Sequence, residues 1–361
     1  MALTAGSFML SVALTGLVKS FARRIGFVSR PVENRFGTRT VPLGGGIAIF
    51  TSIATIIITS ALLIRLLLVP GRLAWLAHTV NIVPADFLGK VNQLAVILLA
   101  ALAVFALGLW DDRKHLGPFF KLFVQFAVAI AAAAFAEVRV EFFIHNRVIT
   151  SVLSAFWIVL IINAFNFLDN MDGLAAGIAA IAAAILFVAA AISGQVFIGG
   201  LALILIGTLL GFLVFNFPPA KIYMGDAGSL VVGFFVAVLT LRTTYYHEAQ
   251  SGRWYPVLLP AIVMAVPLYD FISVTLLRIR QGKSPFVGDT QHFSHRLKRH
   301  GLTDTQTVLT LYLATLCAGL GATFLYQVNL TGAILIFAQT FMILAIIAIF
   351  ETTAKNGRRR D

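Results

Sequence analysis

Long apolar stretches alternate with short polar stretches along the whole chain. An α-helix needs roughly 20 apolar residues to cross the hydrocarbon core of a bilayer. We predict eleven such helices, which begin near residues 4, 44, 92, 119, 150, 173, 196, 228, 255, 306 and 331. Neither an internal repeat nor a linker divides the sequence. The pattern therefore predicts one all-α integral membrane domain over residues 1–361.

The composition agrees with this class and excludes others. Hydrophobic residues make up 59% and charged residues 12% of the 361 residues, which is too apolar for a soluble protein of this length. The net charge is +12, but in a membrane protein the distribution of basic residues says more than their sum, and nucleic acid is not an expected partner. Cys317 is the only cysteine, so no internal disulfide and no cysteine metal site are expected.

Basic residues predict the orientation of the helices. The first apolar stretch has no basic residue before it and is followed by Lys19, Arg23 and Arg24. This order is the reverse of a secretory signal, so we expect an uncleaved first helix with its N-terminus outside. Eleven spans then place the C-terminus in the cytoplasm. In this topology most of the 27 Lys and Arg residues lie in inner loops or the tail, and the exceptions are Arg65, Arg72, Lys90, Arg139, Arg147, Arg242 and Arg253.

The most informative polar stretch is Asn163 to Leu174, which reads NAFNFLDNMDGL between two apolar stretches. An ionised aspartate is costly in hydrocarbon. Asp169 and Asp172 are therefore expected at the water interface or in a polar cavity, where a cation or a phosphate group would justify them. The adjacent pair Asp111 and Asp112 ends an earlier span, and two neighbouring carboxylates repel each other unless a cation or a basic group lies between them.

Two further inner loops carry candidate binding groups. Lys121 lies just inside a span, where its ammonium group could meet a phosphate at the membrane surface; snorkelling to water is the alternative. Asp226 lies in Gly225–Ser229, which opens a helix whose N-terminus favours anions. Its carboxylate suits either a Mg²⁺ site or a plain helix cap. For the glycines Gly44–Gly46, helix packing is the favoured interpretation.

The last inner loop adds two histidines and an arginine. His292 and His295 would share a face if this segment is helical, with Arg296 adjacent; contacts to a diphosphate fit them better than a zinc site. Asp270, inside the ninth span, should face a polar cavity or a partner and support the site. We expect the active site to form from the loops near residues 20–43, 111–118, 169–172, 217–227 and 279–305.

Four motifs, in order, resemble those of the polyprenyl-phosphate N-acetylhexosamine-1-phosphate transferases, of the glycosyltransferase family 4 type: GLWDDR, NAFNFLDNMDGL, MGDAGSL and PLYDFISVTLLRIRQGKSPFVGDTQHFSHRL. The resemblance implies an enzyme of the bacterial inner membrane with its active site facing the cytoplasm. Such an enzyme transfers a sugar 1-phosphate from a UDP-N-acetylhexosamine to a lipid phosphate, usually undecaprenyl phosphate, and releases UMP. Mg²⁺ is the implied cofactor, with Mn²⁺ as an alternative, and membrane lipids surround the protein.

The resemblance also implies roles for individual residues. Asp226 matches the principal Mg²⁺ ligand, and Asp111 and Asp112 match paired aspartates that activate or position the lipid phosphate. Lys121 matches a basic position at the start of the next helix. The third motif shapes the metal and nucleotide site through Asn166, Asp169 and Asp172. The last loop is expected to hold the diphosphate through His292, His295 and Arg296.

The same loop indicates the branch of the family. The branch that makes lipid I from UDP-MurNAc-pentapeptide carries three successive histidines, whereas this chain has His292-Phe293-Ser294-His295-Arg296. The sequence is closer to the branch that transfers N-acetylglucosamine 1-phosphate, and lipid I synthesis is the alternative. A direct attack by the lipid phosphate is favoured over a covalent route through an aspartate. The oligomeric state is open, with a homodimer as one arrangement.

Other functions explain the pattern less well. A lipid or solute transporter usually has ionisable groups near the bilayer midplane and repeated halves, whereas the motifs here collect on one side. The D-x-x-D-G of Asp169–Gly173 also opens the CDP-alcohol phosphotransferase signature, but the charged residues that continue that signature are missing after Gly173. A prenyltransferase would need a second aspartate-rich motif, which we do not find.

Overall fold

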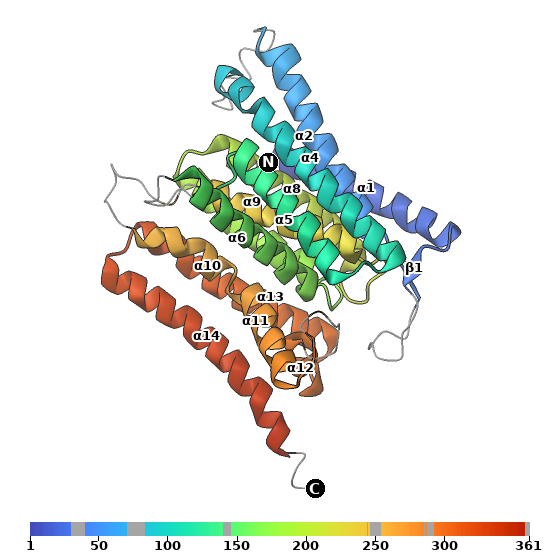
Figure 1. Ribbon diagram of the computed structural model, residues 1–361, viewed down its shortest axis with the longest axis vertical. Coiled ribbons are helices and arrows are strands. Elements are labelled where there is room, and N and C mark those ends of the chain that lie inside the picture. Colours follow the sequence, from blue (N-terminus) through green and yellow to red (C-terminus); the bar gives the residue numbers. More distant parts are fainter. Residues whose placement is uncertain are drawn as a thin grey trace.

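The chain is almost entirely helical in the computed structural model, which describes residues 1–29, 40–70, 84–139, 146–243, 245, 254–284, 286 and 292–357 (Figure 1). Within these residues, ten helices are long and apolar enough to span a membrane. A further bent pair of helices meets the same criterion as a unit, which gives up to eleven spans. The predicted all-α multi-pass membrane class is confirmed, and the ninth predicted span is the one that is broken.

Most of the bundle comes from the first two thirds of the chain. Its helices are α1 Ala2–Arg24, α2 Gly45–Leu63 with the π-helical turn η1 Ile64–Leu68, α4 Pro84–Lys114, α5 Pro118–Phe135, α6 Arg147–Leu168, α7 Leu174–Ile192, α8 Val196–Asn216 and α9 Gly225–Arg242. Helix α9 occupies the centre, because every residue from Ala227 to Thr240 is buried, as expected of a helix that is apolar all round. Helices α2, α4, α6 and α7 all pack against it.

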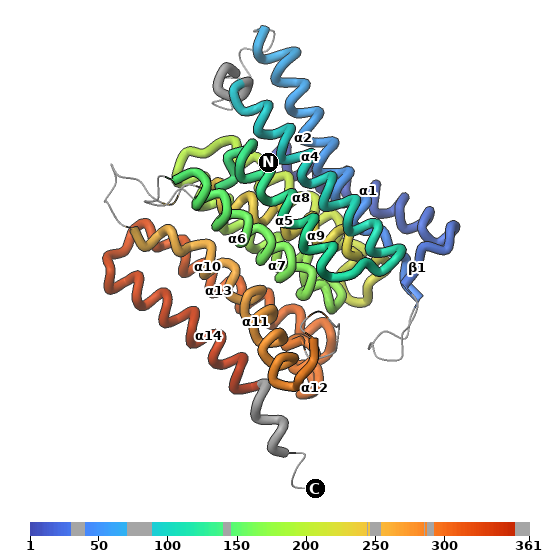
Figure 2. Tube along the Cα trace, viewed as in Figure 1, coloured from blue at the N-terminus to red at the C-terminus, as the bar shows by residue number. Residues whose placement is uncertain are grey.

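The C-terminal helices form a layer along one side of this bundle (Figures 1 and 2). They are the 3₁₀ turn η2 Tyr255–Leu258, α10 Leu259–Val263, α11 Ala265–Arg280, α12 Phe293–Arg299, α13 Asp304–Thr323, the 3₁₀ turn η3 Phe324–Tyr326, and α14 Leu330–Gly357. Helix α13 packs on α7, and α11 packs on α6.

The break in the ninth span follows from its prolines. The segments Tyr255–Val263 and Ala265–Arg280 meet at an angle of 64°. A proline inside a helix lacks an N–H group and its ring clashes with the carbonyl four residues earlier. For Pro267 that carbonyl belongs to Val263, the last residue of α10. The bend therefore falls where this proline does not allow a continuous helix.

One end of the bundle gathers the polar connections. Strand β1 Val28–Ser29 pairs antiparallel with β2 Val41–Pro42, a hairpin that the sequence did not predict. The backbone N–H of Tyr223 donates to the carbonyl of Pro42, and that of Gly45 donates to the carbonyl of Tyr223 (both 2.9 Å). The loop before α9 is thus tied to the start of α2. Of the predicted active-site loops, residues 30–39, 285 and 287–291 lie outside the described part of the chain.

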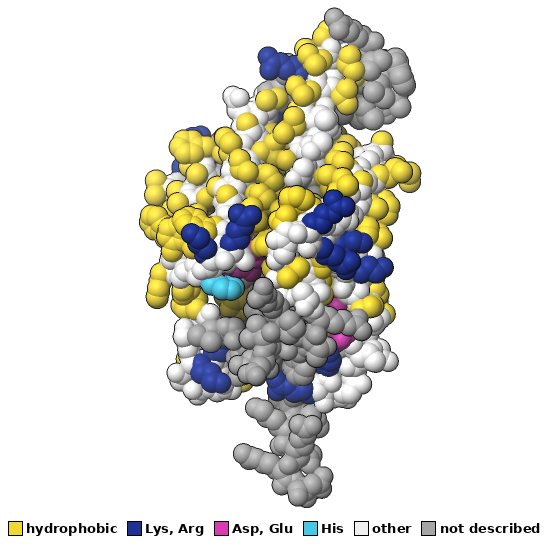
Figure 3. All heavy atoms as spheres, turned by 90° about the vertical axis from the view of Figure 1, so that its right-hand side faces the viewer, with side chains coloured by type: hydrophobic (Ala, Val, Ile, Leu, Met, Phe, Trp, Pro, Cys, Tyr) yellow, Lys and Arg dark blue, Asp and Glu magenta, His cyan; other side chains and the backbone are white. Residues whose placement is uncertain are grey.

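Close backbone packing holds this end together. A Cβ atom on Gly46 would lie 2.3 Å from the backbone N of Gly228, and one on Gly108 would lie 2.5 Å from Cα of Ala227. Both positions therefore require glycine, and the packing interpretation of the glycines at the start of α2 agrees with the structure. A space-filling view from the side shows Lys and Arg side chains gathered in a band, with acidic atoms between them and a broad apolar surface above (Figure 3).

Candidate active site

The first turn of α9 presents Asp226 to the polar end of the bundle. Gly225 has φ +70°, a conformation that glycine adopts without cost, and it brings the next residue into the helix. The backbone N–H groups of Asp226 and Ala227 donate to the two carboxylate oxygens of Asp112, at 2.7 and 3.1 Å. Asp112 on α4 therefore caps α9 from a neighbouring helix, which leaves the Asp226 side chain available for other contacts.

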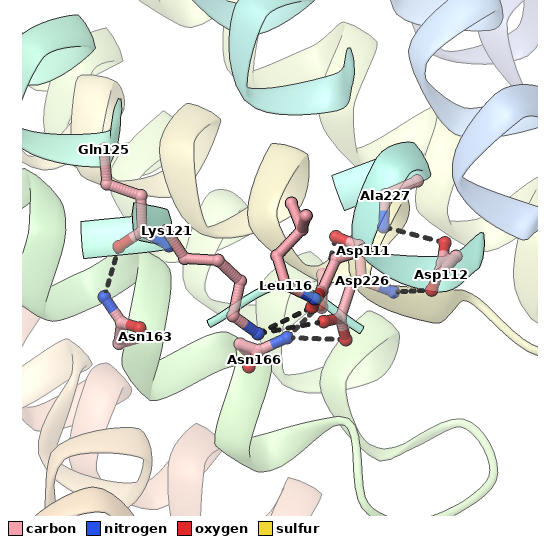
Figure 4. Close-up of polar contacts among 10 residues, drawn as sticks. Asp111, Asp112, Leu116, Lys121, Gln125, Asn163, Asn166, Asp226 and Ala227 are labelled. Carbon is pink, nitrogen blue, oxygen red and sulfur yellow. Dashed lines mark hydrogen bonds and ion pairs between the residues drawn. The ribbon is translucent and has the colours of Figure 1, made fainter. Parts of the chain in front are cut away.

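Four side chains converge beside that turn (Figure 4). Lys121 Nζ lies 2.6 Å from Asp111 Oδ2 and 3.5 Å from Asp226 Oδ2. Asn166 Nδ2 donates to Asp226 Oδ1 at 3.0 Å and to Ser229 Oγ at 2.9 Å. The group unites the C-terminal ends of α4 and α6 with the N-terminal ends of α5 and α9. We call Asp111, Lys121, Asn166 and Asp226 the acidic cluster.

The two members of the aspartate pair face different partners. The side chain of Asp111 is 5% exposed, and its Oδ1 accepts the backbone N–H of Leu116 at 2.6 Å. Asp112 turns the other way, toward the start of α9 (Figure 4). Lys121 is directed at both acids of the cluster and its side chain is 24% exposed, so the snorkelling alternative does not describe it. Asp226 does not cap its own helix, since Asp112 does so.

A metal ion fits the acidic cluster only with help from a ligand. The carboxyl groups of Asp111 and Asp226 lie within hydrogen-bonding reach of each other, and carboxylate oxygens are the ligands that Mg²⁺ prefers. In the described part of the chain, no group of three or more His, Cys, Asp or Glu side chains is arranged to hold a metal. In phosphate-binding sites, Mg²⁺ is usually bound by one or two carboxylates together with phosphate oxygens and water. Asp111 and Asp226 could supply the two carboxylates.

The end of α6 links the acidic cluster to a second group of polar residues. Asn166 reaches Asp226, whereas the ring of the adjacent Phe167 lies edge-on to His292, with ring centroids 5.8 Å apart. The guanidinium group of Arg278 lies over the same phenyl ring, 5.1 Å from its centroid. Arg278 is 2% exposed. A cation at this distance from an aromatic face is attracted by the ring. Phe167 therefore contacts both His292 and Arg278.

Asp270 holds His292 and the start of α12. This fully buried carboxylate accepts the backbone N–H of Phe293 at 3.0 Å and contacts His292 Nδ1 at 2.9 Å. The carboxylate selects the tautomer with a proton on Nδ1 and fixes the direction of the ring. The prediction that Asp270 faces a partner is confirmed, and that partner is the histidine loop.

The remaining residues of this second group lie on α12. They are His295 and Arg296. Together with His292, which precedes α12, and Arg278 on α11, they form a group that we call the basic cluster. The rings of His292 and His295 are 6.3 Å apart, and Arg296 Nη2 donates to Ser273 Oγ at 2.9 Å. Burial lowers the pKa of His295 to about 4, and the neighbouring His292 and Lys298 add to the effect.

The aspartates of the third motif have separate positions. Asp169 follows the last residue of α6 and is half-buried. Asp172 Oδ2 accepts the backbone N–H of Ala220 at 2.8 Å, which ties the loop after α6 to the loop after α8. Between them, Asn170 Oδ1 accepts the hydroxyl of Ser294 at 2.5 Å. Asn170 thus joins the loop of these two aspartates to α12.

Several contributors were not singled out from the sequence. Phe293 and Ser294, where the histidine loop departs from the lipid I pattern, are fully buried and anchor α12 against Tyr269 and Asn170. Gln125 and Asn163 form a hydrogen bond of 2.6 Å between α5 and α6. A polar residue isolated in an apolar helix, such as Gln125, was the available signal.

The fold and these clusters define a multi-pass membrane protein with an acidic and a basic group of side chains at one end of its helix bundle. The sequence pattern of glycosyl transferase family 4 matches residues 94–244. A decaprenyl-phosphate N-acetylglucosaminephosphotransferase of Mycolicibacterium smegmatis (strain ATCC 700084 / mc(2)155) is 30% identical over 323 residues, which cover 83% of this chain and 75% of the relative. The chain belongs to glycosyl transferase family 4, and the predicted family is confirmed.

Two further relatives match over nearly the whole chain. A protein of Bacillus subtilis (strain 168), named probable undecaprenyl-phosphate N-acetylglucosaminyl 1-phosphate transferase, is 29% identical over 350 residues, covering 95% of this chain and 89% of its own length. The undecaprenyl-phosphate alpha-N-acetylglucosaminyl 1-phosphate transferase of Yersinia pestis is 28% identical over 357 residues, covering 94% and 86%. All three relatives bear names of the N-acetylglucosamine branch, which agrees with the predicted branch.

Proposed function

We propose that the chain transfers N-acetylglucosamine 1-phosphate from UDP-N-acetylglucosamine to undecaprenyl phosphate and releases UMP, as the first membrane step of an envelope polysaccharide. The observation that carries the proposal is the acidic cluster, where Lys121 and Asn166 converge on Asp226 at the helix ends. Relatives named for this reaction on undecaprenyl or decaprenyl phosphate support the substrate class.

The reaction needs one new phosphorus–oxygen bond. An oxygen of the lipid phosphate attacks the phosphorus that bears the sugar, the bond from that phosphorus to the UMP oxygen breaks, and UMP leaves with the electron pair. A phosphate monoester is largely ionised near neutral pH because its second pKa is about 6, so strong help from a general base is not required. We propose direct attack by the lipid phosphate. The alternative mechanism is a covalent intermediate on an aspartate.

The acidic cluster suits the lipid phosphate and a metal. Lys121 is already paired with Asp111, and its ammonium group can turn to a phosphate that enters beside it. Asp226 and Asp111 are the residues that would hold Mg²⁺, with Mn²⁺ as the alternative. When bound, the metal supplies positive charge to the transferring and leaving phosphates. Asn166 keeps the Asp226 carboxylate in place through Oδ1.

The basic cluster suits the diphosphate of the sugar nucleotide. Arg278 and Arg296 offer N–H donors to phosphate oxygens, and Asp270 holds the neighbouring His292 ring in place through Nδ1. Burial keeps His295 neutral at physiological pH, so it contributes hydrogen bonds rather than charge. Phe167 places this cluster beside the acidic one. We assign Asp169 and Asp172 to shaping the nucleotide site, through the loop that contacts α12 at Ser294.

The proposed location is the bacterial inner membrane, with both clusters facing the cytoplasm and the N-terminus outside. The support is the distribution of basic residues, which favours the polar end of the bundle as the inner side. Membrane lipids are the surroundings, and a homodimer stays a proposal.

The test is UMP release by the purified protein in detergent with Mg²⁺, undecaprenyl phosphate and UDP-N-acetylglucosamine. UDP-MurNAc-pentapeptide and other UDP-sugars are run in parallel. Release that requires both the lipid and the metal, with N-acetylglucosamine as the preferred sugar, is the expected result. A preference for UDP-MurNAc-pentapeptide would replace the proposed donor with the lipid I alternative. A folded sample that releases no UMP with any donor would overturn the transferase proposal in favour of transport.

A further inference from the structure

Two polar side chains lie one helical turn away from the acidic cluster, inside the apolar contact between α5 and α6. Gln125 on α5 is 1% exposed, and its Oε1 accepts a hydrogen bond of 2.6 Å from Asn163 Nδ2 on α6. The proposed reaction uses neither residue. Asn163 is half-buried, and its Nδ2 also donates to the carbonyl of Val159 on α6 at 2.8 Å. Polar side chains within membrane helices are costly and therefore point to a role.

The spacing of this pair relates it to the acidic cluster. Lys121 and Gln125 are the two polar side chains of α5, and residues four apart lie on one face of a helix. Asn163 and Asn166 are three apart on α6 and also share a face. The contacts therefore form two levels. Lys121 and Asn166 meet on Asp226, and Gln125 meets Asn163 directly one helical turn away, to the left of these residues in Figure 4.

Helix α5 has few fully buried side chains, although the ring of its Phe126 also packs edge-on against Phe156 of α6, with centroids 5.1 Å apart. Its buried residues besides Gln125 are Ala129, Ala132 and Ala133, whose methyl groups pack closely but tolerate sliding and rotation more readily than large interlocking side chains. Rotating α5 by one residue would turn Lys121 by about 100°, away from Asp226. A hydrogen bond between membrane helices has a definite direction and therefore selects one rotation.

We propose that Gln125 and Asn163 are a positioning pair that sets the place of the Lys121 ammonium group between Asp111 and Asp226. The pair acts through α5 and contacts no substrate. Its consequence for catalysis rests on the proposed function, because Lys121 is there the group that meets the lipid phosphate. The position of Lys121 itself is independent of that assignment.

The first test reads the position of Lys121 without any substrate. Purified protein in detergent is treated with sulfo-N-hydroxysuccinimide acetate, and acetylation of Lys121 is followed by mass spectrometry. Gln125→Leu, which removes the acceptor and keeps a similar volume, should increase the labelling rate several-fold. The exchanged pair Gln125→Asn with Asn163→Gln should restore the slow rate, because it keeps the combined length of the two side chains.

A matched control removes another hydrogen bond of α6. Trp157 Nε1 donates to Thr240 Oγ1 at 2.9 Å, between α6 and α9 and away from the acidic cluster. Thr240→Val should leave the labelling of Lys121 unchanged even if it lowers the thermal midpoint. An unchanged labelling rate in folded Gln125→Leu, or equal acceleration by Thr240→Val, would overturn the positioning role.

The second test reads the consequence for turnover. In Gln125→Leu the KM for undecaprenyl phosphate should rise several-fold while the KM for the UDP-sugar stays within twofold, and the exchanged pair should recover most of the loss. A purely structural role would lower the amount of active protein without separating the two KM values. If the wild-type protein has no turnover, the proposed function fails, and the labelling result still decides on the pair.

Discussion

Asp112 accepts the backbone N–H of Asp226 at 2.7 Å, so the carboxylate of one acid of the site holds the backbone of another. The adjacent Asp111 instead pairs with Lys121 at 2.6 Å. Two neighbouring aspartates thus have separate tasks. Asp112 fixes the first turn of α9, and Asp111 contributes a carboxylate to the acidic cluster.

This division predicts different phenotypes for the two aspartates. Asp112→Ala should lower both stability and turnover, because losing a helix cap costs about 0.5–2 kcal/mol and also releases Asp226. Asp111→Asn should abolish most turnover with little loss of stability. Thermal unfolding and UMP release, measured side by side, separate the two effects. Equal thermal midpoints for Asp112→Ala and the wild type would show that the cap does not hold α9.

Asp226→Asn should leave the protein folded but inactive. Asparagine keeps an acceptor for Asn166 but removes the charge that would hold a metal, and loss of a site charge of this kind costs on the order of 10²-fold or more in turnover. The measurement is kcat across a Mg²⁺ titration, with size-exclusion and thermal profiles as the control for folding. Near-normal kcat in this variant would refute the metal role of Asp226.

Close backbone packing around α9 predicts that two glycines are needed. Gly108→Ala would place a methyl group 2.5 Å from Cα of Ala227, and Gly46→Ala would place one 2.3 Å from the backbone N of Gly228. Because backbone cannot move aside as a flexible side chain can, each variant should lose about 1–3 kcal/mol of stability, together with activity. Gly89→Ala is the control, since nothing lies within 4 Å of its Cβ position. Unchanged thermal midpoints in both site variants would contradict this packing.

The bilayer explains why the helices were predictable. A chain that crosses hydrocarbon must satisfy its backbone within each segment, so the lengths of the apolar stretches suffice to find the spans. The bend before α11 could also be anticipated from Pro267. Polar residues at helix ends indicated Asp111, Lys121 and Asp226 of the acidic cluster, whereas Asn166 was assigned through the family resemblance.

The arrangement within the clusters was less accessible. Asp111 and Asp112 are about 100° apart around α4, and only the packing of α9 decides which of them meets a backbone N–H. The contacts of Phe167 with His292 and Arg278 could not be predicted, because phenylalanine is common in membrane helices and does not by itself indicate a site. The pairing of Gln125 with Asn163 joins two helices, and sequence spacing within one helix does not report it.

His295 should make stability depend on pH in the weakly acidic range. Burial lowers its pKa from 6.5 to about 4, so between these values the unfolded chain binds a proton that the folded protein does not. Stability contributed by the neutral imidazole is present above pH 6.5 and is lost as the pH falls toward 4. At pH 5 the difference is on the order of 2 kcal/mol. Thermal midpoints from pH 7.5 to 5 should fall more steeply for the wild type than for His295→Gln, and parallel curves would contradict the buried neutral form.

Lys121 should influence how much the protein gains from Mg²⁺. Its ammonium group lies between Asp111 and Asp226, so Lys121→Met leaves two carboxylates that repel each other. The thermal midpoint of this variant should be lower in EDTA than in Mg²⁺ by more than the wild-type difference, because the metal then replaces the missing cation. Lys298→Met serves as the control: its partner Asp304 is 47% exposed, and an exposed ion pair contributes little. If Mg²⁺ raises the thermal midpoints of all three proteins equally, Asp111 and Asp226 do not form a cation site. A larger increase in Lys121→Met alone places the cation between Asp111 and Asp226.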